Sequence, residues 1–200
     1  MKRTIEERLK SIENEVEIIK REICSKKFSG KRIGDTFDLI GVQWKVLDIT
    51  GDGYACMAMN SVLENEEFDS SGNNWIDSEL RDKLYKNILP KIKNEVGDEN
   101  VIKFKRDLVS MDGLTEYGCC IDEISLLNVD EYRKYRNLIP NSEKEWWWTI
   151  TPWSAKSNNG GVWVAVVSPS GNFNYSIYDC SCGVRPFCIF SSKLFESEKE

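Results

Sequence analysis

A heptad repeat near the amino terminus constrains the fold of this chain more than any other feature. Apolar residues recur there in alternating steps of four and three, as in the seam of a coiled coil: Ile5, Leu9, Ile12, Val16, Ile19 and Ile23. In this register, pairs of opposite charge flank the seam between neighbouring parallel helices: Arg8 with Glu13, Glu15 with Lys20, and Glu22 with Lys27. We therefore predict that residues 1–27 form a coiled-coil oligomerisation helix.

The residue type at the d positions indicates how many helices assemble. In this register the d positions of the heptad are Ile5, Ile12 and Ile19. Leucine packs better than isoleucine at d in a two-stranded coiled coil. The sequence therefore predicts a parallel homotrimer, with a tetramer as the second choice. The alternative is a single amphipathic helix lying on its own domain, but such a helix gives no reason for the matched charge pairs. We expect residues 25–30 to end the helix and to link it to the domain.

Residues 28–195 have the pattern of one domain that mixes strands and helices. Residues 31–62 are rich in β-branched and aromatic residues between turn residues, which predicts a meander of about three strands. Residues 74–96 have helical periodicity with a break expected at Pro90, and Asn128 is a cap for a helix over 129–136. The last quarter is again rich in strand patterns. We expect an α+β fold whose first and last strands share one sheet, followed by a charged tail at 196–200.

Composition excludes several classes of protein. The net charge is −6, which disfavours a nucleic-acid partner because phosphate binding needs clustered Lys and Arg. The chain has no histidine, which removes the commonest general base and the nucleophile pairs that depend on it. No apolar run resembles a signal peptide or approaches the roughly 20 residues of a membrane span. We therefore expect a non-enzymatic protein that is made in the cytoplasm without a signal peptide and is not inserted in a membrane.

The seven cysteines are expected to be reduced thiols, many of them in the core, because no signal peptide directs the chain to an oxidising compartment. Cys180 and Cys182, together with the adjacent Cys119 and Cys120, could supply four thiolates. These spacings are poor for chelating zinc. We expect neither a metal site nor a cofactor.

Several short motifs resemble a family of uncharacterised bacterial and phage domains. The string W-W-T-I-T-P at 147–152 and the string G-V-R-P-F at 183–187 resemble the family signature W-W-x-x-[ST]-P followed by G-V-R-P. A W-x-V-L-D strand at 44–48 and a W-x-x-S-x-L-R helix start at 75–81 match it as well. The resemblance spans about residues 31–191.

The resemblance implies a C-type-lectin-like domain, a fold that formylglycine-generating enzymes share. The chain departs from the family at Thr149 and Ile150, where leucine and arginine are usual, so any role of that arginine does not carry over. By analogy, the segment 151–182 lies on the ligand-binding face of this fold. The lectin calcium motifs E-P-N and W-N-D are absent from the sequence, so calcium-dependent sugar binding is not expected.

The segment 151–182 also differs in composition from the rest of the chain. Of its 32 residues, 17 are Tyr, Ser, Gly, Asn or Trp, and only Lys156 and Asp179 are charged. Rigid aromatic residues mixed with small polar ones are typical of antibody paratopes. We predict an exposed ligand-binding surface formed by Trp153, Lys156, Asn158, Asn159, Asn172, Asn174, Tyr175 and Tyr178. The alternative is a strand-and-turn region that is polar without binding anything.

Together these features favour a phage or prophage display protein, such as a tail-tip receptor binder or a capsid-attached fibre. It would present three copies of the domain to a protein or glycan on a cell surface, where multivalency strengthens weak binding. A virion decoration or assembly protein without a ligand is the structural alternative. A thiol- or metal-dependent enzyme is the third hypothesis.

Overall fold

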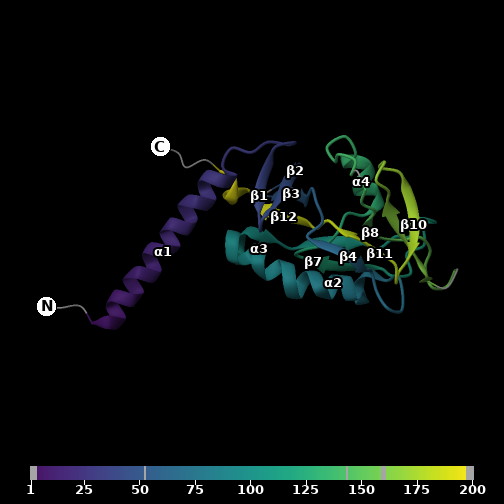
Figure 1. Cartoon of the computed structure of the whole chain (residues 1–200), viewed down its shortest axis with the longest axis horizontal. Helices are drawn as coiled ribbons and strands as arrows, with labels where there is room; N and C mark the ends of the chain where they lie inside the picture. The colour runs from purple at the N-terminus through teal and green to yellow at the C-terminus, as the bar shows by residue number, and fades with distance from the viewer. Residues whose placement is uncertain (1–3, 52, 143, 159–160, 197–200) are drawn as a thin grey trace.

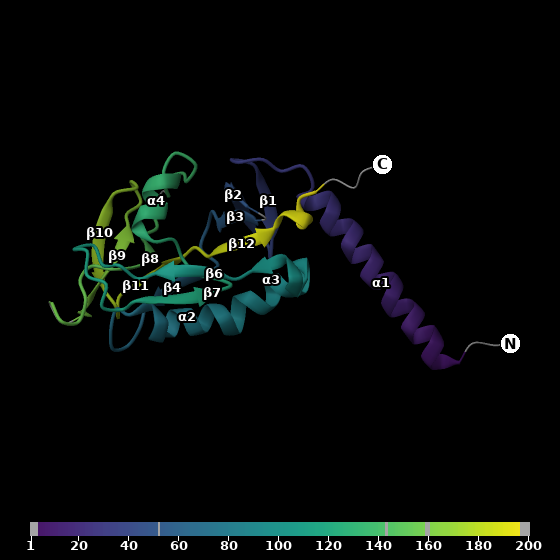
Figure 2. The same ribbon diagram turned by 180° about the vertical axis from the view of Figure 1, so that it is seen from behind.

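The domain is a mixed α+β fold, as the sequence predicts (Figure 1). The structure, a computed structural model, describes residues 4–51, 53–142, 144–158 and 161–196, and the side chains at positions 17, 20, 21, 23–26 and 64 lie outside the described part. Within these residues the strands form two five-stranded sheets and one two-stranded hairpin. The helical segment α2–α3 runs along one side of both sheets, as Figures 1 and 2 show.

The first sheet contains both ends of the domain. Its strands, in spatial order, are β1 (Thr36–Leu39), β2 (Val42–Thr50), β3 (Gly53–Ala58), β12 (Phe187–Ser191) and β5 (Val101–Ile102). The antiparallel meander β1-β2-β3 confirms the prediction for residues 31–62. Strand β12 pairs with β3, so the first and last strands of the domain do share one sheet, as predicted.

The second sheet carries most of the strands from the last quarter of the chain. Its spatial order is β10 (Phe173–Ile177), β9 (Trp163–Val167), β8 (Trp147–Pro152), β11 (Ser181–Val184) and β4 (Leu63–Glu67). Strands β8 and β11 are parallel, and the other neighbours are antiparallel. Strands β6 (Phe104–Asp107) and β7 (Cys119–Asp122) form the separate hairpin.

The G-V-R-P-F motif at 183–187 is divided between the two sheets. Strand β11 ends at Val184 in the second sheet, and β12 begins at Phe187 in the first. Pro186 lies at the crossing, where its lack of a backbone N–H prevents it from continuing a ladder. The chain makes the opposite crossing between β3 and β4, so both crossings connect the same two sheets.

The helical region after Asn74 is continuous across the expected break. It comprises η1 (Trp75–Asp77), α2 (Glu79–Lys83), the π-helical turn η2 (Leu84–Ile88) and α3 (Leu89–Val96), before η3 (Asp98–Asn100). In a regular α-helix the ring of Pro90 would clash with the carbonyl four residues earlier. The wider π turn, in which Leu89 N–H donates to Leu84 O, relieves that clash and lets the helix continue.

Helix α4 (Val129–Tyr135) begins where the sequence predicts. Asn128 Oδ1 accepts a hydrogen bond from Glu131 N at 2.8 Å, and Glu131 Oε2 accepts one from Asn128 N at 2.8 Å. This reciprocal capping box satisfies donors that the first turn of a helix leaves free.

The core has two clusters because successive residues of a strand point to opposite faces. On β8, Trp148 enters the larger cluster with Trp44 and Trp75, and Trp147 enters a second cluster beneath α4. All four indoles are at most 2% exposed, whereas Trp146 is 40% exposed.

Helix α1 (Ile5–Phe28) enters the domain directly, so the linker predicted at 25–30 is wrong. Phe28 is fully buried, with its ring 5.0 Å from that of Phe37 and 5.8 Å from that of Phe195, which follows η5 (Ser192–Leu194). Burying a phenylalanine contributes about 1.5–3 kcal/mol, which fixes the last turn of the helix. The chain leaves the helix only near Gly30, whose φ is +71°.

The rest of α1 projects away from the domain, as Figures 1 and 2 show. Its described seam residues Ile5, Leu9, Ile12, Val16 and Ile19 are 46% to 84% exposed, and the Ile23 side chain lies outside the described part. Lys27, predicted to pair with Glu22 of a neighbouring helix, forms an ion pair with Glu95 of its own domain. The coiled coil itself stays a prediction.

Candidate binding site

Three aromatic side chains meet on the outer part of the second sheet. The ring centroid of Tyr175 lies 4.9 Å from that of Trp153 and 4.9 Å from that of Trp163. Tyr175 pairs with Ala165 in the β9–β10 ladder, so Tyr175 and Trp163 are diagonal neighbours on the same face. Trp153 follows β8, and its backbone N–H donates a hydrogen bond to Trp163 O, at the start of β9, at 2.8 Å. We call these three residues the aromatic cluster.

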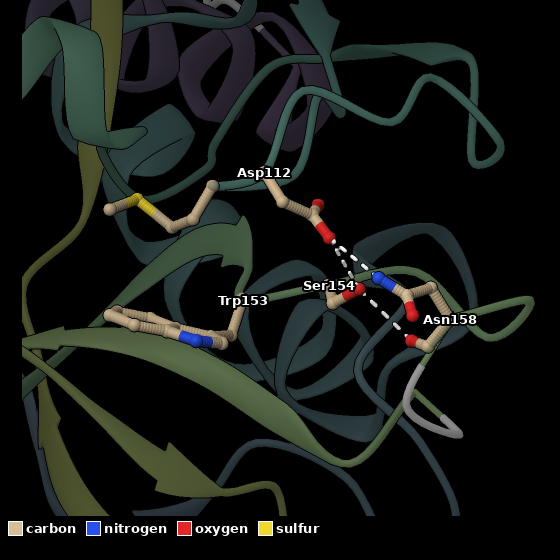
Figure 3. Close-up of a pocket in the computed structure, with 5 residues that line it drawn as sticks. Asp112, Trp153, Ser154 and Asn158 are labelled. Atoms are coloured by element: carbon tan, nitrogen blue, oxygen red, sulfur yellow. Dashed lines mark hydrogen bonds between the residues drawn. The ribbon is translucent and has the colours of Figure 1, made fainter.

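A pocket of about 530 Å³, lined by both polar and apolar residues, adjoins the aromatic cluster. It is lined by Met111, Asp112, Trp153, Ser154 and Asn158. In Figure 3 the polar groups of Asp112, Ser154 and Asn158 point toward one another, and the Trp153 indole extends away from them. Asp112 Oδ2 accepts hydrogen bonds from Ser154 Oγ at 2.7 Å and from Asn158 Nδ2 at 3.1 Å. We call this cavity the Trp153 pocket.

The carboxylate of Asp112 is held ionised by its neighbours. Hydrogen bonds from the hydroxyls of Ser110 and Ser154 lower the pKa of the exposed Asp112 carboxyl. At neutral pH the wall of the pocket therefore contains both a fixed hydrogen-bond acceptor, Asp112, and an aromatic residue, Trp153. Such a combination can bind a ligand that has both an apolar face and hydroxyl or amide donors.

The buried side chain of Asn73 holds the loops of the pocket together. Its Nδ2 donates to Ser154 O and to Trp163 O, each at 2.8 Å, and its Oδ1 accepts from Tyr117 Oη at 2.7 Å. Gly161, with φ of +68°, lies against this group, and a Cβ there would be 3.0 Å from Tyr117 Oη. The site is therefore supported by a connected polar network, which limits its conformational freedom.

The seven described residues of the predicted binding surface do not lie together on one surface. Trp153, Asn158 and Tyr175 lie in or beside the Trp153 pocket, and Lys156 is exposed on the same loop. Asn172 and Asn174 line a separate pocket of about 430 Å³ beside Trp146. Asn174 and Tyr175 are consecutive on β10 and so point to opposite faces of the sheet.

Two members of the predicted surface fall elsewhere. Tyr178 is half-buried against the larger core cluster, and its carbonyl accepts from Phe68 N at 2.8 Å, which gives it a structural role. Asn159 lies outside the described residues.

Sequence reasoning missed Asp112, Ser154 and Asn73 as members of the site. Asp112 lies between β6 and β7, some forty residues before Trp153, in a loop without a recognisable motif. The two segments meet because Met111 N donates to Pro152 O at 2.9 Å at the end of β8. The only local signal was the turn at Gly113, which does not specify a partner.

Burial disfavours the thiolate form of several described cysteines. Burial raises the pKa of Cys120 to about 11 and that of Cys182 to about 12. The thiolate, which is the nucleophile and the metal ligand, is therefore disfavoured at both positions. Among the described residues, no group of three or more His, Cys, Asp or Glu side chains is arranged to hold a metal ion.

The comparisons with known proteins return no match: no family model, no curated protein and no solved structure matches this chain. The resemblance to the bacterial and phage domain family therefore stays a prediction. Across the part of the chain that the structure describes, no helix has the length and apolar character needed to cross a membrane.

Proposed function

We propose that the chain is an oligomeric display protein. Its α1 helices assemble copies in parallel, and each domain presents the aromatic cluster and the Trp153 pocket to a protein or glycan on a cell surface. The observation that carries the proposal is the separation of two exposed features. The apolar stripe of α1 lies at one end of the molecule, and β10, which carries Tyr175, lies at the other (Figure 1).

The occupant proposed for the apolar stripe is the same helix of further copies of this chain. A helix of 24 residues is about 36 Å long, and without tertiary packing such a helix is marginal in water. Assembly in the heptad register buries the stripe and places Arg8 beside Glu13 of a neighbouring copy. Isoleucine at the d positions favours three copies.

The chemistry of the Trp153 pocket supports binding. Tyrosine and tryptophan supply large contact areas with few rotatable bonds, so little entropy is lost when they bind. Asp112 and Asn158 add oriented polar contacts beside them. Three copies on one stalk would raise the avidity of a weak single site by orders of magnitude.

The sequence resemblance supports a particular setting for this activity. It favours a C-type-lectin-like domain that is associated with a phage virion, as a tail-tip receptor binder or a capsid-attached fibre. A virion decoration or assembly protein is the second candidate. The predicted binding residues are divided between two pockets, so each pocket offers a ligand a smaller contact area than the single predicted surface would. This division favours the decoration or assembly protein, which needs no ligand.

Labelled full-length protein applied to glycan and cell-surface protein arrays tests the proposal. Tyr175→Ala should weaken the strongest binding by about 2 kcal/mol, or about thirtyfold, if Tyr175 anchors the ligand. Trp146→Ala is the matched control, because Trp146 is also a partly exposed aromatic residue but lines the other pocket. Binding to neither array, or equal losses in the two variants, would leave the decoration protein as the better explanation.

A further inference from the structure

A second polar pocket lies where the chain crosses between the two sheets. Its volume is about 450 Å³, within the range of small-molecule sites. Ser61 contributes from the β3–β4 crossing, Arg185 from the β11–β12 crossing, and Lys144 and Glu145 from the segment before β8. None of these residues belongs to the Trp153 pocket.

Arg185 is fixed in this pocket with part of its guanidinium unused. The side chain is almost fully buried, and its Nε and Nη2 donate to Glu145 Oε2 at 3.0 and 2.8 Å. The guanidinium also lies 5.4 Å from the ring centroid of Trp147. Nη1, although buried, has no hydrogen-bond partner among the described residues.

The hydroxyl of Ser61 is a second unused group in the same pocket. Ser61 Oγ is buried and has no partner within the described part of the chain. A Cβ at Gly183 would lie 2.4 Å from Ser61 Oγ and 2.4 Å from Glu145 Oε1, so glycine leaves the room in which these groups converge. Buried polar groups without partners are rare and costly, and two that line one pocket indicate a bound partner.

The charge of the pocket indicates the sign of that partner. Among the described residues that line it, Lys45, Lys144 and Arg185 are cationic and Glu145 alone is acidic, although the chain as a whole carries a net charge of −6. An anion is therefore attracted. Two donors without a partner among the described residues, Arg185 Nη1 and Ser61 Oγ, match the two acceptor oxygens of a carboxylate. Amide side chains of Asn60 and Asn141 complete the wall with groups that bind hydroxyls.

We propose that this pocket binds a small organic carboxylate, with one oxygen accepting from Arg185 Nη1 and the other from Ser61 Oγ. Lys144, which is exposed at the rim, contributes a further charge. Glu145 and Trp147 hold Arg185 in place. This inference uses neither the aromatic cluster nor α1, and it stands independently of the proposed function.

Nuclear magnetic resonance titration of the full-length protein tests the proposal. The probes are acetate, lactate and D-glucuronate, each beside its uncharged counterpart acetamide, lactamide or glucose, with inorganic phosphate as a separate arm. At millimolar concentration, at least one carboxylate should shift the signals of Ser61 N–H and Arg185 Nε–H, and its uncharged counterpart should not. Shifts with no carboxylate, equal shifts with a counterpart, or tighter binding of phosphate would each overturn the proposal.

Ser61→Ala supplies the matched variant. The hydroxyl has no partner within the described chain, so its removal should leave the fold intact and weaken carboxylate binding by about tenfold or more. Ser125→Ala is the control, because Ser125 Oγ is also buried and without a partner among the described residues but lies outside this pocket. Unchanged binding by Ser61→Ala, or the same loss in Ser125→Ala, would contradict the assigned contacts.

Discussion

At the scale of single residues, Asp122 shows how a buried charge is accommodated in this domain. Its carboxylate is fully buried on β7 and accepts hydrogen bonds from Trp75 Nε1 at 2.8 Å, Arg81 Nε at 2.9 Å and Tyr85 Oη at 3.3 Å. A buried carboxylate is tolerated only when it is paired and hydrogen-bonded in this way. Trp75 therefore contributes a polar contact in addition to its apolar area.

We predict that Trp75→Phe destabilises the domain more than Trp44→Phe. Both indoles are fully buried, but Trp44 Nε1 donates to the neutral carbonyl of Leu39 at 3.2 Å, whereas Trp75 Nε1 donates to the charged Asp122. Hydrogen bonds to charged groups contribute about 1.5–3 kcal/mol, against about 1 kcal/mol for neutral ones. Urea denaturation of both variants measures the difference, and equal or reversed losses would contradict the importance of Asp122.

At the scale of elements, the sequence pattern of α1 favours a helix, and its exposure results from how little of it packs on the domain. Its heptad periodicity and the charged residues between the apolar ones favour a helix. Only its last turn packs on the domain, through Phe28. The domain therefore leaves the apolar stripe of α1 exposed. The partner that we propose for it is the same helix of further copies of this chain.

We predict that Ile12→Asn combined with Ile19→Asn converts the oligomer to a monomer. Both changes place polar groups at seam positions, where burial without a guaranteed partner is costly. Light scattering measures the mass. Ile18→Asn is the matched control, since Ile18 is 55% exposed on the same helix but lies outside the seam. A monomeric mass for the unmodified chain at micromolar concentration would refute the coiled coil.

At the scale of the whole molecule, Phe28 connects helix α1 to the domain. Its ring packs between those of Phe37 and Phe195, so the helix, the first strand and the carboxy-terminal end of the domain meet at one point. The direction in which α1 leaves the domain is therefore fixed by core packing.

We predict that Phe28→Ala lowers the free energy of unfolding by about 3–5 kcal/mol while the oligomeric mass is retained. The cavity forms in the domain core, and the heptad seam is unchanged. Ile33→Ala, at a half-exposed apolar position nearby in sequence, should cost at most about 0.5 kcal/mol. Calorimetry combined with light scattering separates the two properties. A lower oligomeric mass for Phe28→Ala would contradict this prediction and show that α1 and the domain unfold as one cooperative unit.

The sequence by itself determined the features that depend on neighbours along the chain. Alternation and β-branched residues predicted the meander β1-β2-β3, and Asn128 with Glu131 predicted the start of α4. A large apolar indole favours burial, and Trp44 and Trp148, which lie on strands, are fully buried. Each of these signals extends over a few residues, which is the range of periodicity and capping.

Only the tertiary structure decided which distant segments meet. The hydrogen bond from Ser154 to Asp112 and the ion pair of Arg185 with Glu145 join residues about forty positions apart. No local pattern specifies the paths of the loops between them. The same holds for the division of the predicted binding surface, because the face to which Asn174 and Tyr175 point depends on strand register. The fold class follows from short-range sequence patterns. The positions of the residues that line the two pockets follow from contacts between segments that are distant in the sequence.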